Sequence, residues 1–211
     1  MRFPGLLLVL LLAFPSLSRS EGIRILCLGD SITAGANSYK VYRPFLAKKL
    51  AEAGVAATFV GPNKDRDGLA HAGYGGSSAE KVLEAYRKFH DRIPADVILI
   101  HSGHNHTAEE KPIPGILEAT KAMVAQARKD NPEVIVLLAK AITSGKLPKY
   151  SYIPELNGEI GALGKKLNVT VVDQAEGFDW ETDTIADHVH PNAAGAAKMA
   201  AKWFAALKPL L

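Results

Sequence analysis

Residues 96–101 read Asp-Val-Ile-Leu-Ile-His, and the central residues of this stretch form a continuous apolar run. A strand without polar alternation is buried on both faces, which is typical of a parallel sheet covered by helices on both sides. Similar runs of strand length occur elsewhere, at Ile23–Leu28, Ala56–Val60, Glu133–Ala139 and Val169–Val172. The sequence therefore predicts a five-stranded parallel sheet with residues 96–101 as a central strand.

Longer segments of helical periodicity separate these runs. They are Tyr39–Ala53, Ser77–Asp91, Ile116–Asp130, Pro154–Leu167 and Asn192–Leu207. Alternating strands and helices are the pattern of βαβ units, whose right-handed crossovers place helices on both faces of the sheet. We therefore expect an α/β fold, a three-layer α/β/α sandwich, whose ligand site lies beyond the carboxyl ends of the strands.

The N-terminal residues have the organisation of a secretory signal peptide. Arg2 precedes an apolar run from Leu6 to Phe14, and small residues flank Arg19 before Glu21. This run has about half of the roughly 20 residues that a membrane span needs. We therefore expect residues 1–20 to be removed on export, and residues 21–211 to form one secreted or periplasmic domain without stable membrane association.

The charge balance argues against polyanionic partners, and the cysteine content excludes an internal disulfide. The chain has 25 Lys and Arg against 22 Asp and Glu, and loss of Arg2 and Arg19 with the leader leaves 23 against 22. Because a balanced surface does not attract polyanions, neither nucleic acid nor an anionic membrane is expected as a partner. Cys27 is the only cysteine, so an internal disulfide is excluded. The oligomeric state stays open.

The first predicted strand runs into Gly29-Asp30-Ser31-Ile32-Thr33-Ala34-Gly35. A serine at the tip of a sharply turning strand has an exposed hydroxyl flanked by backbone N–H groups, which suits a nucleophile and its oxyanion product. The structural alternative is an ordinary turn in which Ser31 caps a helix, because Gly, Asp and Ser are common turn residues.

A candidate acid–base pair lies near the C-terminus, in Asp187-His188-Val189-His190-Pro191-Asn192. An Asp three residues before a His can accept the Nδ1 proton of that imidazole and leave Nε2 to take a proton from a serine. His188 lacks this spacing from Asp187 and is the weaker candidate for the base. The alternative is that these side chains only cap the helix that follows.

Two further loops offer hydrogen-bond donors. Gly103-His104-Asn105 follows the third predicted strand, and the side-chain NH₂ of Asn105 can stabilise a developing oxyanion. The loop Ala72-Gly73-Tyr74-Gly75-Gly76-Ser77 can add a backbone N–H, because glycine permits close approach and unusual dihedral angles. A flexible turn before a helix is the alternative for the second loop.

Together, in this order, the four segments resemble the motifs of the SGNH, or GDSL-type, hydrolase family. The resemblance implies a flavodoxin-like fold and ester hydrolysis through an acyl-enzyme, without metal or cofactor. It implies that Ser31 attacks the carbonyl, that His190 is general base and then general acid, and that Asp187 orients His190. The N–H groups of Ser31 and Gly76 and the side chain of Asn105 would form the oxyanion hole. The serine does not lie in a Gly-x-Ser-x-Gly elbow, which separates the chain from α/β-hydrolases.

One position departs from the family pattern. Members commonly have Asp directly after the motif asparagine, whereas this sequence has His106. We therefore expect His106 to make a different loop contact or to reach toward substrate. Asp30 and Trp180 are further candidates for substrate contact, while Trp203 fits the core because of its apolar helix.

Other interpretations of the same residues are weaker. His101, His104 and His106 suggest a metal site, but strand alternation would turn His101 away and no His-Glu-x-x-His motif accompanies them. Asp65 and Asp67 suggest a calcium loop, but no glutamate follows at the EF-hand distance. A non-catalytic carbohydrate-binding module would be expected to have lost a member of the triad.

The substrate is expected to be a short-chain ester. No long apolar lid is visible in the sequence, which disfavours long-chain lipid esters. The likeness to acetylxylan-esterase-like members implies O-acetyl groups on a polysaccharide. A general short-chain carboxylesterase or a lysophospholipase-like esterase is the alternative.

Overall fold

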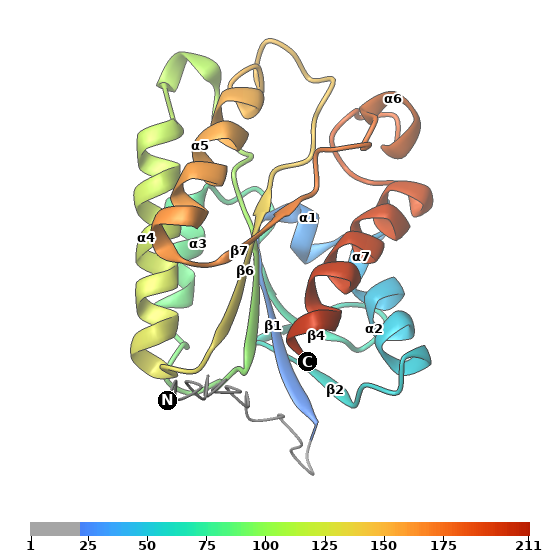
Figure 1. Ribbon diagram of the computed structural model, residues 1–211. Helices are drawn as coiled ribbons and strands as arrows, with labels where there is room; N and C mark the ends of the chain where they lie inside the picture. The colour runs from blue at the N-terminus through green and yellow to red at the C-terminus, as the bar shows by residue number, and fades with distance from the viewer. Residues whose placement is uncertain (1–21) are drawn as a thin grey trace, which may run out of the picture.

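A computed structural model describes residues 22–211. The predicted signal peptide, residues 1–20, lies outside the described residues and stays a prediction. The described chain forms a central sheet with helices on both faces (Figure 1). The predicted α/β/α sandwich is therefore confirmed. Within residues 22–211, no helix combines the length and apolar character needed to cross a bilayer.

The five predicted strands are present and pair in parallel. They are β1 (Ile23–Gly29), β2 (Ala57–Val60), β5 (Val97–His101), β6 (Ile135–Lys140) and β7 (Thr170–Asp173). Their order in the sheet is β2-β1-β5-β6-β7. This is the flavodoxin-like order, in which the chain leaves β1 on one side and returns on the other.

The predicted number of strands was wrong, because residues 22–211 form a sheet of seven strands. β4 (Ala70–Gly73) runs parallel to the end of β1, beyond the part that pairs with β2, and β3 (Asn63–Lys64) is antiparallel to β4. Both strands are short and contain Asn, Lys, His and Gly, so they carry no apolar run. They form because the upper half of β1 offers free backbone groups next to β2.

Helices cover the two faces unequally. α3 (Ala79–Tyr86), α4 (Ile113–Asp130) and α5 (Ile153–Leu167) cover one face, and α2 (Tyr42–Glu52) and α7 (Ala193–Leu207) cover the other (Figure 1). Short helical turns occur at α1 (Ser31–Ala34), η1 (Ala108–Glu110), α6 (Trp180–Asp183) and η2 (Lys208–Leu210). All long predicted helices are present, with shifted ends.

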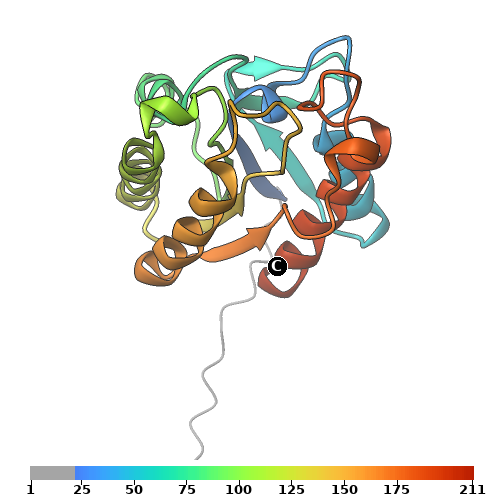
Figure 2. The ribbon, with the colours of Figure 1, turned by 90° about the horizontal axis from the view of Figure 1, so that it is seen from above.

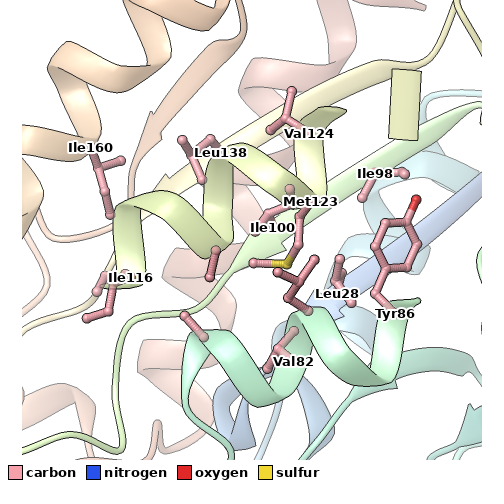
Figure 3. Close-up of a cluster of buried hydrophobic side chains, with 14 of the residues drawn as sticks. Leu28, Val82, Tyr86, Ile98, Ile100, Ile116, Met123, Val124, Leu138 and Ile160 are labelled. Atoms are coloured by element: carbon pink, nitrogen blue, oxygen red, sulfur yellow. The ribbon is translucent and has the colours of Figure 1, made fainter. Parts of the chain in front are cut away.

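Two hydrophobic clusters hold the layers together. On β5, Ile98 and Ile100 pack under the helices α3 and α4, where Figure 3 shows them beside Met123. Val97 and Leu99, which point to the opposite face, pack under α2 and α7. Because all five residues of β5 are buried, the continuous apolar run identifies the centre of the sheet.

The carboxyl ends of β1 and β5 meet at the point where the strand order reverses. Gly29 pairs with His101 at these ends. A Cβ at Gly29 would lie 2.0 Å from the carbonyl oxygen of His101, so the close approach of the two strands requires glycine. Figure 2 looks down on this edge, where the loops after β1 and β5 gather.

Candidate active site

Ser31 is the first residue of α1, and a single residue separates it from the end of β1 at Gly29. Asp30 precedes it as N-cap, and the Oδ1 atom of Asp30 accepts a hydrogen bond of 3.0 Å from the N–H of Ile32. This cap starts a helix immediately after a strand, which produces the sharp turn that the sequence predicts. The Ser31 side chain thus lies at the rim of the sheet on a fixed backbone.

Asp30 itself does not face the substrate side. Its side chain is fully buried, and Oδ2 accepts a long hydrogen bond of 3.4 Å from the backbone N–H of His104. Burial raises the pKa of Asp30, but the neighbouring imidazoles of His104 and His101 outweigh it and keep the pKa below its ordinary value. The expected substrate contact of Asp30 does not fit this position, and the carboxylate instead joins the α1 turn to the loop after β5.

His190 lies between Ser31 and Asp187. Its Nε2 atom is 2.9 Å from Oγ of Ser31, and its Nδ1 atom is 2.6 Å from Oδ2 of Asp187. The three side chains therefore form a continuous hydrogen-bonded chain between two segments that are 159 residues apart in sequence. An imidazole held in this way has its Nδ1 proton fixed toward the carboxylate and its Nε2 lone pair toward the hydroxyl.

The segment around Asp187 has a preorganised backbone. Oδ1 of Asp187 accepts hydrogen bonds of 2.9 Å from the backbone N–H groups of Val189 and His190. Burial raises the pKa of Asp187, but the hydrogen bonds from His190 and from these N–H groups outweigh it, so the pKa lies below its ordinary value. The carboxylate is therefore ionised wherever an imidazole titrates.

Tyr39 also contacts this triad, and no sequence pattern pointed to it. Its ring stacks on the imidazole of His190 with centroids 4.2 Å apart and planes at 21°, and its hydroxyl donates a 2.8 Å hydrogen bond to the carbonyl oxygen of Ser31. Burial, followed by the charge of Asp30, raises the pKa of Tyr39 to about 12. The phenol is thus a neutral donor. Tyr39 was predicted to start a helix, but a bridge between Ala36 and Tyr39 delays α2 until Tyr42.

The two predicted oxyanion loops lie against each other at the same edge. The side-chain NH₂ of Asn105 donates a 3.0 Å hydrogen bond to the carbonyl oxygen of Ser77. Asn105 and Gly76 both have positive φ, of 69° and 71°. Since an amide carries two N–H bonds, one can hold the loop while the other serves an oxyanion. The N–H of Tyr74 binds the carbonyl oxygen of Gly29, which ties this loop to the end of β1.

His106 forms a loop contact between two acidic side chains. Its Nδ1 atom is 2.9 Å from Oε2 of Glu110 and its Nε2 atom is 3.0 Å from Oε2 of Glu80. Both ring nitrogens are thus engaged by carboxylates, which joins η1 to α3 beside Asn105. Of the two roles expected for His106, the structure places it in the loop contact.

Trp180 and His188 are in contact with each other. Trp180 begins α6 and meets the ring of His188 edge-on, with centroids 5.2 Å apart. Trp180 also lines a cavity of about 560 Å³ together with Tyr150 and the exposed Leu147. The ring of His188 therefore faces Trp180, whereas the imidazole within hydrogen-bond distance of Ser31 is that of His190.

His101 and His104 are buried behind the nucleophile. Their rings stack with centroids 6.0 Å apart, and burial lowers the pKa of His101 to about 4. Within residues 22–211, no group of three or more His, Cys, Asp or Glu side chains is arranged to hold a metal ion. Trp203 is a residue of α7 and its side chain is fully buried, in agreement with the expected core role.

Comparisons with known proteins bear on the family and the fold of the chain. The GDSL-like Lipase/Acylhydrolase family matches residues 27–198. A comparison with curated proteins found no match. Among solved structures, a carbohydrate esterase family 3 protein from Talaromyces cellulolyticus is 22% identical with a TM-score of 0.79, over 89% of this chain and 97% of the other.

Two other solved structures have the same fold. A family 3 carbohydrate esterase from Clostridium thermocellum is 24% identical with a TM-score of 0.75, over 89% of this chain and 96% of the other. A lipase/acylhydrolase from Enterococcus faecalis is 20% identical with a TM-score of 0.70, over 90% and 97%. At these identities the likeness concerns the fold, which is shared over nearly the whole described chain.

Proposed function

The chain belongs to the GDSL-like lipase/acylhydrolase family and is an ester hydrolase, and we propose that it removes acetyl groups from exported or extracellular carbohydrate. Ser31, His190 and Asp187 act as its catalytic triad. The observation that carries this assignment is the pair of hydrogen bonds of 2.9 Å and 2.6 Å on the two nitrogens of one imidazole.

In the acylation step, Oγ of Ser31 bonds to the carbonyl carbon of the ester while its proton passes to Nε2 of His190. The carbonyl oxygen becomes an oxyanion. The C–O bond to the alcohol then breaks, and His190 returns the proton to the leaving alcohol oxygen. An acetyl ester of Ser31 remains, and Asp187 stabilises the imidazolium while it exists.

In the deacylation step, a water molecule replaces the alcohol. His190 takes a proton from the water as its oxygen attacks the acetyl carbon, and Oγ of Ser31 leaves with that proton. Acetic acid is released with the second proton of the water, which it then loses to solvent to become acetate, and the free serine is restored, so atoms and charges balance over the cycle. No cofactor enters this scheme.

The oxyanion is held by the backbone N–H groups of Ser31 and Gly76 and by the NH₂ group of Asn105. A donor aimed at this oxygen contributes about 2.7–4 kcal/mol in other acyl-transfer enzymes. Support for this role comes from the position of the two loops, which meet through the Asn105 to Ser77 hydrogen bond at the edge where Ser31 lies.

Three observations support an acetylated carbohydrate as substrate. The half-buried ring of Trp180, which is suited to a sugar face, lines one cavity. The cavity lined by Tyr39, which stacks on His190, and the cavity lined by Trp180 both mix polar and apolar residues, as a sugar ring requires. Two of the similar structures are carbohydrate esterases. Export is supported by the sequence of residues 1–20.

The test compares wild type with Ser31→Ala on two substrates, 4-nitrophenyl acetate and acetylated xylan. We expect wild type to release acetate from both and Ser31→Ala to lose nearly all activity on both. Equal activity of the two proteins would contradict the triad. Faster hydrolysis of hexanoyl than of acetyl esters, with no acetate from xylan, would instead favour a general esterase or a lysophospholipase-like enzyme.

A further inference from the structure

A second cavity, of about 400 Å³, lies beside the nucleophile turn. It is bounded by the segment that follows α1 and by the β3–β4 hairpin, which the sequence did not predict. We call it the hairpin cavity. Its lining includes Tyr39, Phe45, Lys40, Lys64, Arg66 and Asp67.

Tyr39 joins the hairpin cavity to the catalytic triad. The same side chain that lines the cavity stacks on His190 and donates to the carbonyl oxygen of Ser31. A ligand in the hairpin cavity therefore touches a residue that contacts the triad directly. This places the cavity beside the catalytic triad.

The cavity has an excess of positive charge. Lys40, Lys64 and Arg66 line it and are exposed, and among residues 22–211 none of the three forms an ion pair with a carboxylate. Asp65 also lines the cavity, but it is neutralised by an ion pair of 2.8 Å with Arg43. Asp67 is the remaining acid, so cations outnumber uncompensated anions.

A buried arginine fixes this charged wall relative to the nucleophile. The Arg43 side chain has no exposed surface, and it donates to Asp65 of the hairpin and to the carbonyl oxygen of Thr33 in α1. Oδ1 of Asp65 also accepts hydrogen bonds of 3.0 Å and 2.9 Å from the N–H groups of Asp67 and Leu69. The hairpin and the α1 turn are thus held by one guanidinium group.

From this arrangement we infer that the hairpin cavity is a subsite for the carboxylate of an acidic sugar next to the acetylated unit. The inference rests on the proposed carbohydrate esterase function and names its substrate class as an acetylated glycan that contains uronic acid. Lys64 and Arg66 supply the charges for the carboxylate. Tyr39 and Phe45 supply ring surface for the sugar.

The chemistry favours a single carboxylate over a polyanion. The positive side chains converge on one concave cavity, whereas nucleic acid binding needs a stripe of charge along many phosphates. The chain as a whole has 25 basic and 22 acidic residues, so the surplus at the cavity is local. A sugar carboxylate carries one charge and presents two acceptor oxygens, which a lysine and an arginine can share.

The test uses two forms of one substrate, acetylated glucuronoxylan and the same material after chemical reduction of its carboxyl groups. We expect wild type to have a kcat/KM about fivefold higher on the acidic form, the size of effect that two exposed charge pairs give together. This ratio should fall to about one in Lys64→Ala/Arg66→Ala and in 0.5 M NaCl, where the Debye length is only a few ångströms. Because the ratio compares two substrates on one protein, it does not depend on the folded fraction.

The matched control is Lys165→Ala/Lys166→Ala, which removes two exposed positive charges from the end of α5 on the other face of the sheet. We expect this variant to keep the wild-type ratio. A ratio of one in wild type would overturn the subsite and leave the esterase proposal intact. Activity on 4-nitrophenyl acetate without release from either glycan would overturn the carbohydrate function and the subsite together.

One further experiment distinguishes an acidic glycan from an anionic lipid as the ligand of the cavity. Lysophosphatidic acid is an acyl ester of glycerol phosphate and carries a phosphate in place of the sugar carboxylate. Hydrolysis of that ester faster than of either glycan, lost in Lys64→Ala/Arg66→Ala, would overturn the sugar assignment of the cavity.

Discussion

The ring of Tyr39 lies face to face with the imidazole of His190, with centroids 4.2 Å apart. The phenol therefore covers one face of the imidazole, whose hydrogen bonds extend from the ring edge. The hydroxyl of the same residue holds the carbonyl oxygen of Ser31. One side chain thus fixes the position of both partners in the proposed proton transfer.

Two substitutions separate the ring of Tyr39 from its hydroxyl. Tyr39→Phe keeps the stack and loses the hydrogen bond, whereas Tyr39→Leu loses both. Because an aromatic stack contributes about 0.5–1.5 kcal/mol and a hydrogen bond about the same, we expect kcat/KM to fall about threefold in Tyr39→Phe and about tenfold or more in Tyr39→Leu. Steady-state kinetics with 4-nitrophenyl acetate measure both, and equal values for the two variants would argue against a role of the ring.

Removal of the Asn105 side chain tests the oxyanion hole. Asn105→Ala loses the NH₂ donor and should lower kcat about 100- to 1,000-fold, with KM nearly unchanged, because the donor acts on charge that develops in the transition state. The same change removes the hydrogen bond to Ser77. Ser77→Ala keeps the backbone carbonyl group and serves as control. A large increase in KM with an unchanged kcat for Asn105→Ala would contradict this role.

Substitution of His106 by the residue that is common in the family should harm this protein. His106→Asp would replace an imidazole between the carboxylates of Glu80 and Glu110 by a third carboxylate. Like charges at this spacing repel, so we expect the Tm at pH 7 to fall by about 3 °C or more. The combination with Glu80→Gln and Glu110→Gln removes the repulsion and should recover most of the loss. Recovery should be measured by thermal unfolding, and its absence would exclude a charge effect.

Two buried imidazoles predict loss of stability in weak acid. Burial lowers the pKa of His71 and of His101 to about 4 in the folded protein. The unfolded chain takes up these protons near the ordinary pKa of about 6.5, so the free energy of unfolding falls as the pH drops from about 6.5 to about 4. We expect a loss on the order of 1–2 kcal/mol for each group between pH 7 and pH 5.

His101→Phe tests the contribution of one of these two groups. Both ring nitrogens of His101 lack a hydrogen-bond partner within residues 22–211, so a phenyl ring of similar shape leaves no partner unsatisfied. Urea unfolding at pH 7 and pH 5 should show a smaller loss for His101→Phe than for wild type. An unchanged difference between the two pH values would mean that other groups take up the protons.

The parallel core of this fold could be predicted from the sequence because each of its strands buries its own apolar run. The hairpin could not, since β4 is ordered by pairing with β1, β3 by pairing with β4, and the loop between them by the Arg43 to Asp65 ion pair. A fully buried arginine such as Arg43 has no local sequence signature. It becomes recognisable only when the carboxylate 22 residues away is placed beside it.

The candidate triad was predictable for a related reason. Ser31 follows a strand end, and the spacing of Asp187 and His190 is local, so both appear as short motifs. Tyr39 reaches the same site from an irregular loop, and nothing in its neighbours distinguishes it from a helix-starting tyrosine. His106 was visible as a departure from the family pattern, but its two glutamate partners come from α3 and η1, which only the fold brings together.

The contacts of Arg43 with Asp65 and Thr33 set a condition for engineering the hairpin. A hairpin transplanted from a homologue into residues 61–69 would bring new specificity only if the incoming loop supplied an acid to replace Asp65. Without that acid, the guanidinium of Arg43 would be buried without a partner carboxylate, and the graft would disturb the turn that carries Ser31. Position 43 and the loop therefore have to be exchanged as one unit.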